Sequence, residues 1–555
     1  MEIKKLTEAL SVSPQIAASD VAQLLANGFK SIICNRPDGE GADQPSFSEI
    51  AVAAQQAGLN VHYLPAESGK VTDAQGVAFG HLMETLPKPV LAYCRTGMRS
   101  TSMWALSVAS SRSSADILEA AGKAGYDLKG LVRRILNGGK TPVEIADASH
   151  DVVIIGGGAA GIAVASSLLA RQANLDIAII DPADIHYYQP GWTLVGGGVF
   201  NAASTARTMA SVLPKGVHWI KSAVAAFEPD RNAVILDGCR VVRYQQLVVC
   251  PGLKLDWNGI EGLAETLGRN GVTSNYRYDL APYTWDLVRN MRGGKAIFTQ
   301  PPMPIKCAGA PQKAMYLSAD HWKRQGVLSN VDIQFCNAGA VLFGVADYVP
   351  ALMEYVKAYG INLNFGQTLI AVDGAAKQAR FSVNRPDGAK EIISRAFDMM
   401  HVVPPQKAPD FIRVSPLADT AGWVDVDPAT LQHKLHKNIF ALGDVSNTTN
   451  AKTAAAARKQ APVVAHNILA ERGASQSQAK YDGYGSCPLT VERGKIVLAE
   501  FTYGGKVAPS FPSWFIDGTK PSALAWYLKE RILPPLYWDG MLKGREWMAQ
   551  PEMVG

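Results

Sequence analysis

The fold is decided by one stretch, Asp151-Val152-Val153-Ile154-Ile155-Gly156-Gly157-Gly158-Ala159-Ala160-Gly161. Its apolar half predicts a buried strand, and the alanine-rich residues after the glycines predict a helix. Gly156 allows a tight turn, Gly158 lets backbone approach a pyrophosphate, and Gly161 lets the helix pack closely on the strand. The helix N-terminus would then face negative phosphates. The stretch therefore predicts a dinucleotide-binding unit on a parallel sheet.

A second strand is expected at residues 176–180, and it ends in Asp181, 25 positions after Gly156. An acid at this place can accept a hydrogen bond from the adenosine ribose. A glycine pattern alone is weak evidence, but strand, glycines, helix, strand and acid in this order are specific. These residues leave NAD and FAD open as ligands.

The chain has 555 residues, of which 47% are hydrophobic and 19% charged. These values describe a globular protein long enough for three or more domains. The net charge is only +5, and no basic run is present, so we expect no nucleic-acid partner. No stretch has the apolar length of a signal peptide or a membrane span. Seven scattered cysteines without metal-ligand spacing indicate a reducing cytoplasm and no metal site.

Strand-like and helical runs alternate along the chain, and this pattern predicts an α/β protein. Residues 1–110 are expected to form a small α/β unit with strands at residues 31–34, 61–64 and 90–93. Residues 111–150 resemble a helical linker that ends in a polar stretch. Residues 151–510 form the nucleotide-binding part, and residues 511–555 form an aromatic-rich tail.

A second nucleotide motif lies far along the chain, at residues 438–444. This stretch ends in Gly443-Asp444 and resembles the second FAD motif of glutathione-reductase-like flavoproteins, in which the aspartate holds the ribityl chain. The helix expected to start near Lys452-Thr453 would point its positive end at the flavin and stabilise the reduced form. Both motifs together favour FAD as the cofactor and a Rossmann-like flavoprotein fold with two dinucleotide-binding domains.

A cysteine stands where a nicotinamide-binding loop would otherwise lie. The expected strand at residues 295–299 is followed by Pro304-Ile305-Lys306-Cys307-Ala308-Gly309-Ala310-Pro311-Gln312-Lys313 in place of a second glycine motif. Lys306 and Lys313 are close in sequence, and a nearby positive charge lowers a thiol pKa. We therefore expect Cys307 to be a catalytic thiol that passes electrons to the flavin.

Four segments together resemble the sulfide:quinone oxidoreductases, in particular the branch that includes the mitochondrial enzyme. They are residues 187–196, Cys307, residues 452–455 and residues 481–489. The resemblance covers about residues 151–550. It implies that sulfide is oxidised at a cysteine pair beside FAD, that Cys307 holds the sulfane sulfur, and that Gln189 and Pro190 lie at the cofactor.

The same resemblance implies the partners and the location of the protein. Electrons would pass to a membrane quinone, and the sulfur would leave as a persulfide on an acceptor such as a small thiol. The enzyme would then be cytoplasmic and peripheral on the inner face of a bacterial membrane.

The sequence does not identify the second redox thiol that would pair with Cys307. The resemblance implies that the second redox cysteine of the family directly follows Gly443-Asp444, but this chain has Val445 there, so the usual disulfide cannot form at this position. Cys336, at the end of an expected strand, is one candidate for a resolving thiol. Cys250 is another, although its surroundings resemble a loop near the FAD phosphates. In a third route Cys307 needs no partner, because the flavin takes the two electrons directly.

A cysteine loop, Cys94-Arg95-Thr96-Gly97-Met98-Arg99-Ser100, follows an expected strand in the N-terminal unit. Backbone N–H groups in such a loop bind anions, and the next helix N-terminus stabilises a negative sulfur. Phosphatase loops have five residues between Cys and Arg, whereas rhodanese-like loops have four, as between Cys94 and Arg99. With residues 35–40, the loop resembles the phosphatase-like domain that is also fused to β-lactamase-like hydrolases. We expect persulfide handling; phosphatase activity and a non-catalytic domain are the alternatives.

The tail combines four tryptophans with many other apolar side chains, and its charges cancel. Such an amphipathic surface suits contact with one leaflet of a membrane, from which a quinone enters. The alternative is packing on its own domain or on a second subunit of a homo-oligomer.

Two other functions fit the same folds. A persulfide or coenzyme A disulfide reductase would need NAD(P)H, and the missing second glycine motif counts against it. A flavin–thiol redox sensor would use Cys307 as a switch.

Overall fold

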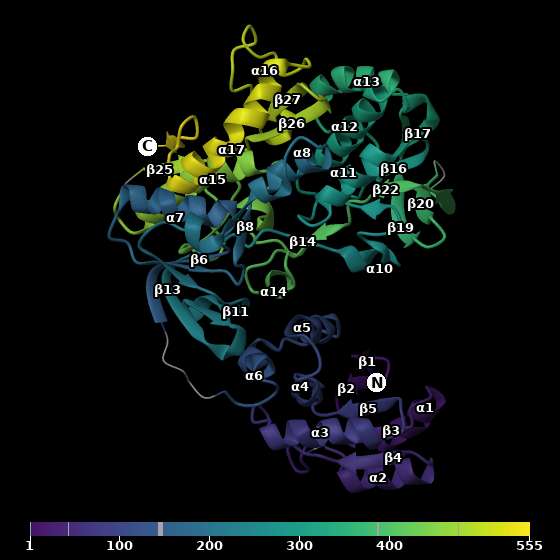
Figure 1. Cartoon of the computed structure of the whole chain (residues 1–555). Coiled ribbons are helices and arrows are strands. Elements are labelled where there is room, and N and C mark those ends of the chain that lie inside the picture. Colours follow the sequence, from purple (N-terminus) through teal and green to yellow (C-terminus); the bar gives the residue numbers. More distant parts are fainter. Residues whose placement is uncertain (1, 43, 143–147, 386–387, 476, 555) are drawn as a thin grey trace. The chain divides into compact units, whose positions relative to one another are not determined.

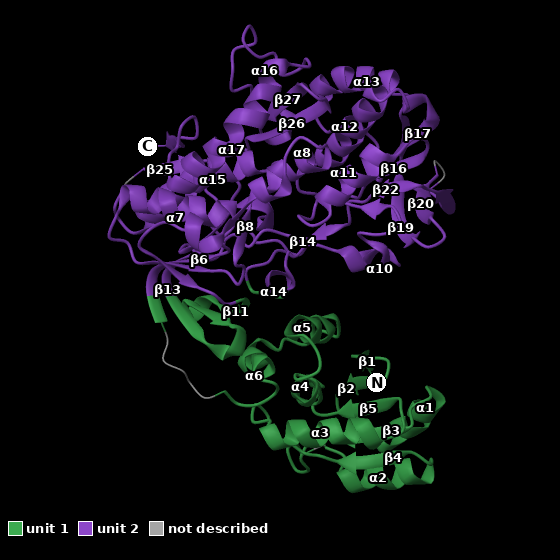
Figure 2. Cartoon of the chain, viewed as in Figure 1, with its two compact units in different colours: residues 1–149, 223–243, 414–416 green, residues 150–222, 244–413, 417–555 purple. Residues whose placement is uncertain are grey.

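The computed structural model describes residues 2–42, 44–142, 148–385, 388–475 and 477–554. It divides into two compact units (Figures 1 and 2). Unit 1 contains residues 1–149, 223–243 and 414–416, and unit 2 contains residues 150–222, 244–413 and 417–555.

Unit 1 is built on a five-stranded sheet in the order β1-β2-β5-β3-β4. All of its strands except β1 run parallel, as expected for strands joined through helices. The strands are β1 (Lys4–Lys5), β2 (Leu10–Ser13), β3 (Ser31–Cys34), β4 (Asn60–Tyr63) and β5 (Val90–Tyr93). The helices around it are η1 (Ala18–Asp20), α1 (Val21–Ala26), α2 (Phe47–Gln56), α3 (Asp73–Thr85) and α4 (Met98–Ser107). The predicted α/β character of this part is confirmed.

Unit 1 continues beyond residue 110 into packed helices. Ile117, Ala121 and Ile135 are buried in the same hydrophobic cluster as Trp104, so the suggested linker is helical and belongs to the folded unit. Residues 143–147 of the expected polar stretch lie outside the described residues. The further elements of unit 1 are α5 (Ser114–Lys123), η2 (Lys129–Leu131), α6 (Val132–Leu136), β11 (Val224–Glu228), η5 (Pro229–Arg231), β12 (Ala233–Leu236), η6 (Asp237–Cys239) and the first residues of β13 (Val241–Val249).

The glycine-rich stretch connects β6 (Ala148–Ile155) to α7 (Ala159–Arg171), as predicted. Its sheet has the order β10 (Val217–Ile220), β7 (Ile177–Ile180), β6 and β13, and β24 (Ile439–Ala441) runs parallel to β13. The helix after the second motif, α15 (Ala454–Glu471), packs with α7 in one hydrophobic core. Two nucleotide motifs that are far apart in sequence therefore meet in one domain.

A second parallel sheet has the order β15-β22-β16-β17-β18, with a three-stranded antiparallel sheet β19-β20-β21. Cys307 lies in the loop between β16 and α12 (Ala310–Arg324). The strands are β15 (Val272–Thr273), β16 (Gly294–Gln300), β17 (Val331–Asn337), β18 (Asn362–Phe365), β19 (Gln367–Asp373), β20 (Gln378–Asn384), β21 (Lys390–Ala396) and β22 (Met399–His401). The predicted fold of two Rossmann-like domains is confirmed.

The connecting elements of unit 2 are short. They are β8 (Ile185–Tyr187), η3 (Gln189–Gly191), α8 (Trp192–Gly196), η4 (Ala202–Thr205), β9 (Ala206–Thr208), α9 (Met209–Val212), β14 (Lys254–Leu255), η7 (Trp257–Gly259), α10 (Leu263–Thr266), α11 (Ala281–Asn290), η8 (Leu328–Asn330), η9 (Ala346–Tyr348), α13 (Val349–Ala358), β23 (Gln406–Lys407), α14 (Asp410–Arg413), η10 (Gly443–Val445) and β25 (Gln478–Lys480).

The C-terminal segment follows a hairpin of β26 (Gly485–Glu492) and β27 (Lys495–Phe501). One part of the tail is core, because Tyr537, Trp538, Met541 and Leu542 are buried with α7 and α15. Its helical elements are η11 (Tyr503–Gly505), α16 (Ala523–Tyr527), η12 (Leu528–Ile532), α17 (Leu533–Pro535), η13 (Leu536–Gly540) and η14 (Met541–Lys543), and β28 (Glu552–Val554) follows them.

The other part of the tail is exposed. Trp514 is 84% exposed and Tyr527 58%, and Phe515, Leu524 and Ile532 of the same segment are exposed as well. Across the described ranges, no helix combines the length and the apolar character needed to cross a membrane.

Candidate flavin and sulfur site

The glycine loop of β6–α7 forms one end of a large cavity in unit 2, of about 1020 Å³. A Cβ at residue 161 would lie 1.9 Å from the Gly156 carbonyl oxygen, so only glycine lets α7 pack this closely. Gly158 faces open space and lines the cavity. Asp181 lines it too, and its carboxylate accepts hydrogen bonds from the backbone N–H groups of Gly157 (2.6 Å) and Ala183 (2.8 Å). This edge is built for the adenosine and pyrophosphate of a dinucleotide.

The second motif forms another wall of the same cavity, which Gly443, Asp444, Lys452 and Thr453 all line. The Gly443 N–H donates to Gln460 (2.8 Å), and Lys452 Nζ donates to the carbonyls of Asp444 (2.9 Å) and Ser446 (2.8 Å). Thr453 Oγ1 caps α15 by accepting from the Ala456 N–H (3.2 Å). The N-terminus of α15 is thereby held at the cavity, with Lys452 beside it.

The residues present fit FAD. Burial raises the pKa of the Asp444 carboxyl and lowers that of Lys452 to about 8, so both groups gain from a polar ligand. The buried amide of Asn275 also lines the cavity and has no hydrogen-bond partner among the described residues. Gln189 and Pro190 line it from η3, and Lys306 Nζ donates to Gln189 Oε1.

Cys307 lies at the same cavity, and a second thiol faces it. Its Sγ is 3.8 Å from the Sγ of Cys487, which comes from β26. A disulfide needs about 2.05 Å, so both sulfurs are thiols here and lie close enough to bond after a small movement. The Cys307 N–H donates to the Lys452 carbonyl (2.9 Å). A Cβ at residue 309 would lie 2.5 Å from the Cys487 sulfur, so Gly309 permits the approach.

Two buried lysines surround the sulfur pair. Lys313 Nζ donates to Cys307 Sγ at 3.1 Å, and Lys529 reaches in from the tail, where its Nζ donates to the Pro190 carbonyl (3.3 Å). The hydrogen bond from the Cys487 thiol, with the charge of Lys313, holds the pKa of Cys307 well below its usual value despite burial. The pKa of Cys487 is raised well above its usual value by the same hydrogen bond and by burial. Cys307, which Lys313 contacts, is therefore the more acidic of the two thiols.

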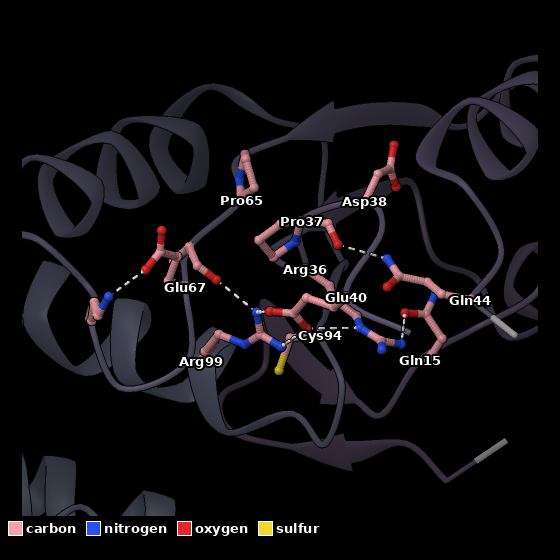
Figure 3. Close-up of polar contacts among 12 residues, drawn as sticks. Gln15, Arg36, Pro37, Asp38, Glu40, Gln44, Pro65, Glu67, Cys94 and Arg99 are labelled. Carbon is pink, nitrogen blue, oxygen red and sulfur yellow. Dashed lines mark hydrogen bonds and ion pairs between the residues drawn. The ribbon is translucent and has the colours of Figure 1, made fainter. Parts of the chain in front are cut away.

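The Cys94 loop of unit 1 has the predicted strand–loop–helix setting between β5 and α4. Gly97 has a φ of +92°, and its N–H donates to Cys94 Sγ at 3.2 Å. Tyr126 Oη donates to the Thr96 carbonyl (3.2 Å) and holds the loop from outside. Cys94 is 1% exposed and lies beside Arg99, as Figure 3 shows.

Comparison with known proteins assigns both parts of the chain. Residues 150–284 match the family model of pyridine nucleotide-disulphide oxidoreductases. Over 402 residues, 72% of this chain and 87% of the relative, the chain is 43% identical to the mitochondrial sulfide:quinone oxidoreductase of Dictyostelium discoideum. It is 38% identical to that of Mus musculus over 71% of this chain and 87% of the relative. The chain belongs to the sulfide:quinone oxidoreductase family.

The protein is a FAD-dependent oxidoreductase, as the sequence predicted. The solved sulfide:quinone oxidoreductase of the hyperthermophilic bacterium Aquifex aeolicus shares its fold, with a TM-score of 0.60 at 20% identity over 72% of this chain and 92% of that chain. Residues 2–111 match the model of the phosphatase-like domain of β-lactamase hydrolase-like proteins. One such protein, from Xylella fastidiosa (strain Temecula1), is 35% identical over 130 residues, which is 30% of its length. The chain is thus a fusion.

The structure places Cys487, and not Cys336, beside Cys307. Cys336 pairs with Thr299 across β17 and β16 and is buried with Ile297, on the sheet face opposite the cluster that holds Phe335 and contacts Cys307. Burial raises its pKa to about 12. Strand neighbours point to opposite faces, so a strand-end position did not bring Cys336 to Cys307.

Position 445, where the resemblance places the second redox cysteine of the family, holds valine in this chain. Val445 is buried, and the second sulfur arrives from β26. Cys250 lies under the glycine turn, where its Sγ donates to the Gly156 carbonyl (3.7 Å), so it packs the cofactor loop. Cys487 was within a motif that indicated the family, at residues 481–489, and that was the available signal.

One group of metal-ligand type lies elsewhere in unit 2, although the cysteine spacing indicated no metal site. His150, Asp176 and His218 place their ligand atoms within 4.8 Å of one another at the start of neighbouring strands. The Asp176 carboxylate pairs with His150 Nδ1 at 3.0 Å and with His218 Nε2 at 3.5 Å. In the described structure these three side chains form a polar cluster, and none of them lines the cavity.

Proposed function

We propose that this enzyme oxidises sulfide at the Cys307–Cys487 pair and delivers sulfane sulfur to a small thiol. The observation that carries the proposal is the 3.8 Å approach of the two sulfurs at the cavity wall, with Lys313 on one of them. Two thiols this close can form a disulfide after a small movement, and exchange with a third thiol opens it again.

The charges decide which cysteine receives the sulfur. In the oxidised pair, HS⁻ attacks the sulfur of Cys487; the Cys307–Cys487 bond breaks, a persulfide forms on Cys487, and Cys307 leaves as a thiolate. The thiol with the lower pKa is the better leaving group, and Lys313 stabilises the charge that it takes away. This assignment reverses the expectation that Cys307 itself holds the sulfane sulfur.

The cycle closes by sulfur transfer and loss of two electrons. A small thiolate attacks the outer sulfur of the Cys487 persulfide, takes it as its own persulfide, and leaves Cys487 as a thiolate. The pair then returns to the disulfide by giving up two electrons. FAD, which the glycine loop and Asp444 would hold, would supply the two-electron acceptor, and a membrane quinone would be the final oxidant.

The N-terminal unit would handle the persulfide that the flavin domain produces. Its cysteine loop has the four-residue spacing of sulfur-transfer loops, and it is fused to a domain that makes sulfane sulfur. The distinguishing products are thiocyanate, from thiosulfate and cyanide, for sulfur transfer and phosphate for a phosphatase.

Anaerobic titration with sulfide tests the main proposal. We expect sulfide to bleach the flavin, quinone to restore it, and mass spectrometry of trapped enzyme to find the extra sulfur on Cys487. NADH is expected to leave the flavin oxidised. Bleaching by NADH would instead select the NAD(P)H-dependent reductase, and bleaching by sulfide without turnover by quinone would select the redox sensor.

The exposed aromatic side chains of the tail support a membrane surface as a partner, on the inner face of a bacterial membrane. Replacing Trp514, Phe515 and Tyr527 by serine should lower binding to lipid vesicles about 100-fold or more, because each loses an apolar side chain that enters the interface. Flotation with vesicles measures this, and FAD content should stay unchanged. The matched control replaces Ile392 and Leu435, exposed apolar residues outside the tail, and should float as the parent does. An equal loss of vesicle binding in the tail variant and in the control would contradict a membrane contact made by the tail.

A further inference from the structure

The arginine of the Cys94 loop is occupied by a carboxylate of the same unit (Figure 3). Arg99 binds Glu40 through both terminal nitrogens, Nη1 to Oε1 and Nη2 to Oε2, each at 2.7 Å. Arg36 Nε donates to the same carboxylate at 3.1 Å. Two guanidinium groups therefore converge on one carboxylate beside Cys94.

This arrangement is an oxyanion site in shape and charge. Arg36 is 8% exposed and Arg99 5%, so two buried positive charges are balanced by a single negative one. A guanidinium fork binds a carboxylate or a tetrahedral oxyanion with the same pair of parallel hydrogen bonds. The buried hydroxyl of Ser100, next in the loop, has no hydrogen-bond partner in the described part of the chain, so a further donor is available.

Glu40 is the member of this group that can leave. Its side chain is 25% exposed, whereas the side chain of Arg99 is 6% exposed and is also fixed by a hydrogen bond to the Ala66 carbonyl (2.7 Å). The hydrogen bond from Arg99 lowers the pKa of the Glu40 carboxyl, so the carboxylate is charged at neutral pH and competes with any anion for the fork. An incoming anion can replace it while the two arginines stay in place.

We propose that Glu40 is a resident competitor in an oxyanion site formed by Arg36, Arg99 and the Cys94 loop, and that a tetrahedral sulfur oxyanion such as thiosulfate displaces it to reach Cys94. This inference rests on the proposed persulfide handling of unit 1 and names its substrate class. It assigns a role to Arg36 and Glu40, which lie more than fifty positions before the cysteine loop in the sequence.

The sulfate concentration that protects Cys94 distinguishes a Glu40 that competes with anions from a Glu40 that only orients Arg99. In full-length, FAD-loaded protein, the alkylation rate of Cys94 by iodoacetamide is followed by peptide mass spectrometry at increasing sulfate, a non-transferable analogue. For Glu40→Gln we expect sulfate to protect Cys94 at a concentration about tenfold lower or less, because a charged competitor is removed. Protection at an unchanged or higher concentration would mean that Glu40 orients Arg99, and would overturn the proposal.

The matched control is Glu67→Gln, which removes the same charge from an exposed carboxylate paired with Lys70 in the same unit. In this variant sulfate should protect Cys94 from alkylation at the same concentration as in the parent. A second series with phosphate identifies the anion: protection at lower phosphate than sulfate would overturn the assignment to sulfur oxyanions.

Thiocyanate release from thiosulfate and cyanide separates this inference from the proposed function. We expect release by the parent, loss with Cys94→Ser, and a lower KM for thiosulfate with Glu40→Gln. If Glu40→Gln is protected at lower sulfate but the parent releases no thiocyanate, the oxyanion site is supported and sulfur transfer is refuted. Thiocyanate release with unchanged sulfate protection in Glu40→Gln would keep the function and refute the competitor.

Discussion

Replacing either Cys307 or Cys487 by serine should slow flavin reduction by sulfide about 1,000-fold or more. Each change removes one sulfur of the pair, so HS⁻ has no disulfide to open, and residues that act as one unit fail together. The double variant should be no slower than either single variant. Anaerobic stopped-flow measurement of the flavin absorbance gives the rates.

The matched control is Cys336→Ala. This cysteine is buried, as Cys487 is, but lies in a different cluster, so sulfide should reduce the flavin of this variant at nearly the parent rate. All variants should keep FAD, because none of these side chains belongs to its glycine loop. A fast Cys487→Ser enzyme would show that Cys307 works without a thiol partner.

Replacing Lys313 by methionine should lower the reactivity of Cys307 at pH 7 about 10- to 100-fold. The positive charge at 3.1 Å is one cause of the low pKa of this thiol, so its loss raises the pKa. A raised pKa leaves less thiolate at neutral pH, and the deficit should disappear as the pH rises above the new value. The alkylation rate of Cys307 in the reduced protein, measured against pH, should show its midpoint moved upward.

Lys323→Met is the control for this change. Lys323 is an exposed lysine on the same helix, α12, and its loss should leave the midpoint where it is in the parent. A midpoint that stayed unmoved in Lys313→Met would mean that Lys313 does not set the pKa of Cys307, and that the hydrogen bond from Cys487 and the charge of Lys529 do.

Most of the fold and of the cofactor site could be predicted from local sequence patterns. The run from Asp151 to Gly161 contains its own strand, turn and helix signals, and Asp181 follows at a distance set by one βαβ unit. The same holds for the Cys94 loop, whose strand and helix flank it directly. Such features depend on neighbours in sequence, so their chemistry is readable without the tertiary structure.

The sulfur partner could not be read in this way. Cys307 and Cys487 are 180 positions apart, and their contact depends on how the β26–β27 hairpin docks on α12. Cys336 was attractive because its strand neighbours the one before Cys307, but a shift of one residue along a strand turns a side chain to the other face. The role of Glu40 was hidden for the same reason, since only the folded loop sets it on Arg99.

The position of Lys529 in the chain determines when the sulfur site is completed during synthesis. Three separate parts of the chain build the sulfur site: Cys307 with Lys313, then Cys487, and last Lys529. Lys529 is buried near the two sulfurs. During synthesis the N-terminal parts fold first, and contacts of long sequence separation form late. A nascent chain released before residue 529 therefore lacks one of the charges around the thiolate. The sulfur site therefore gains its full set of positive charges only after residue 529 has been added and has packed against the sulfurs.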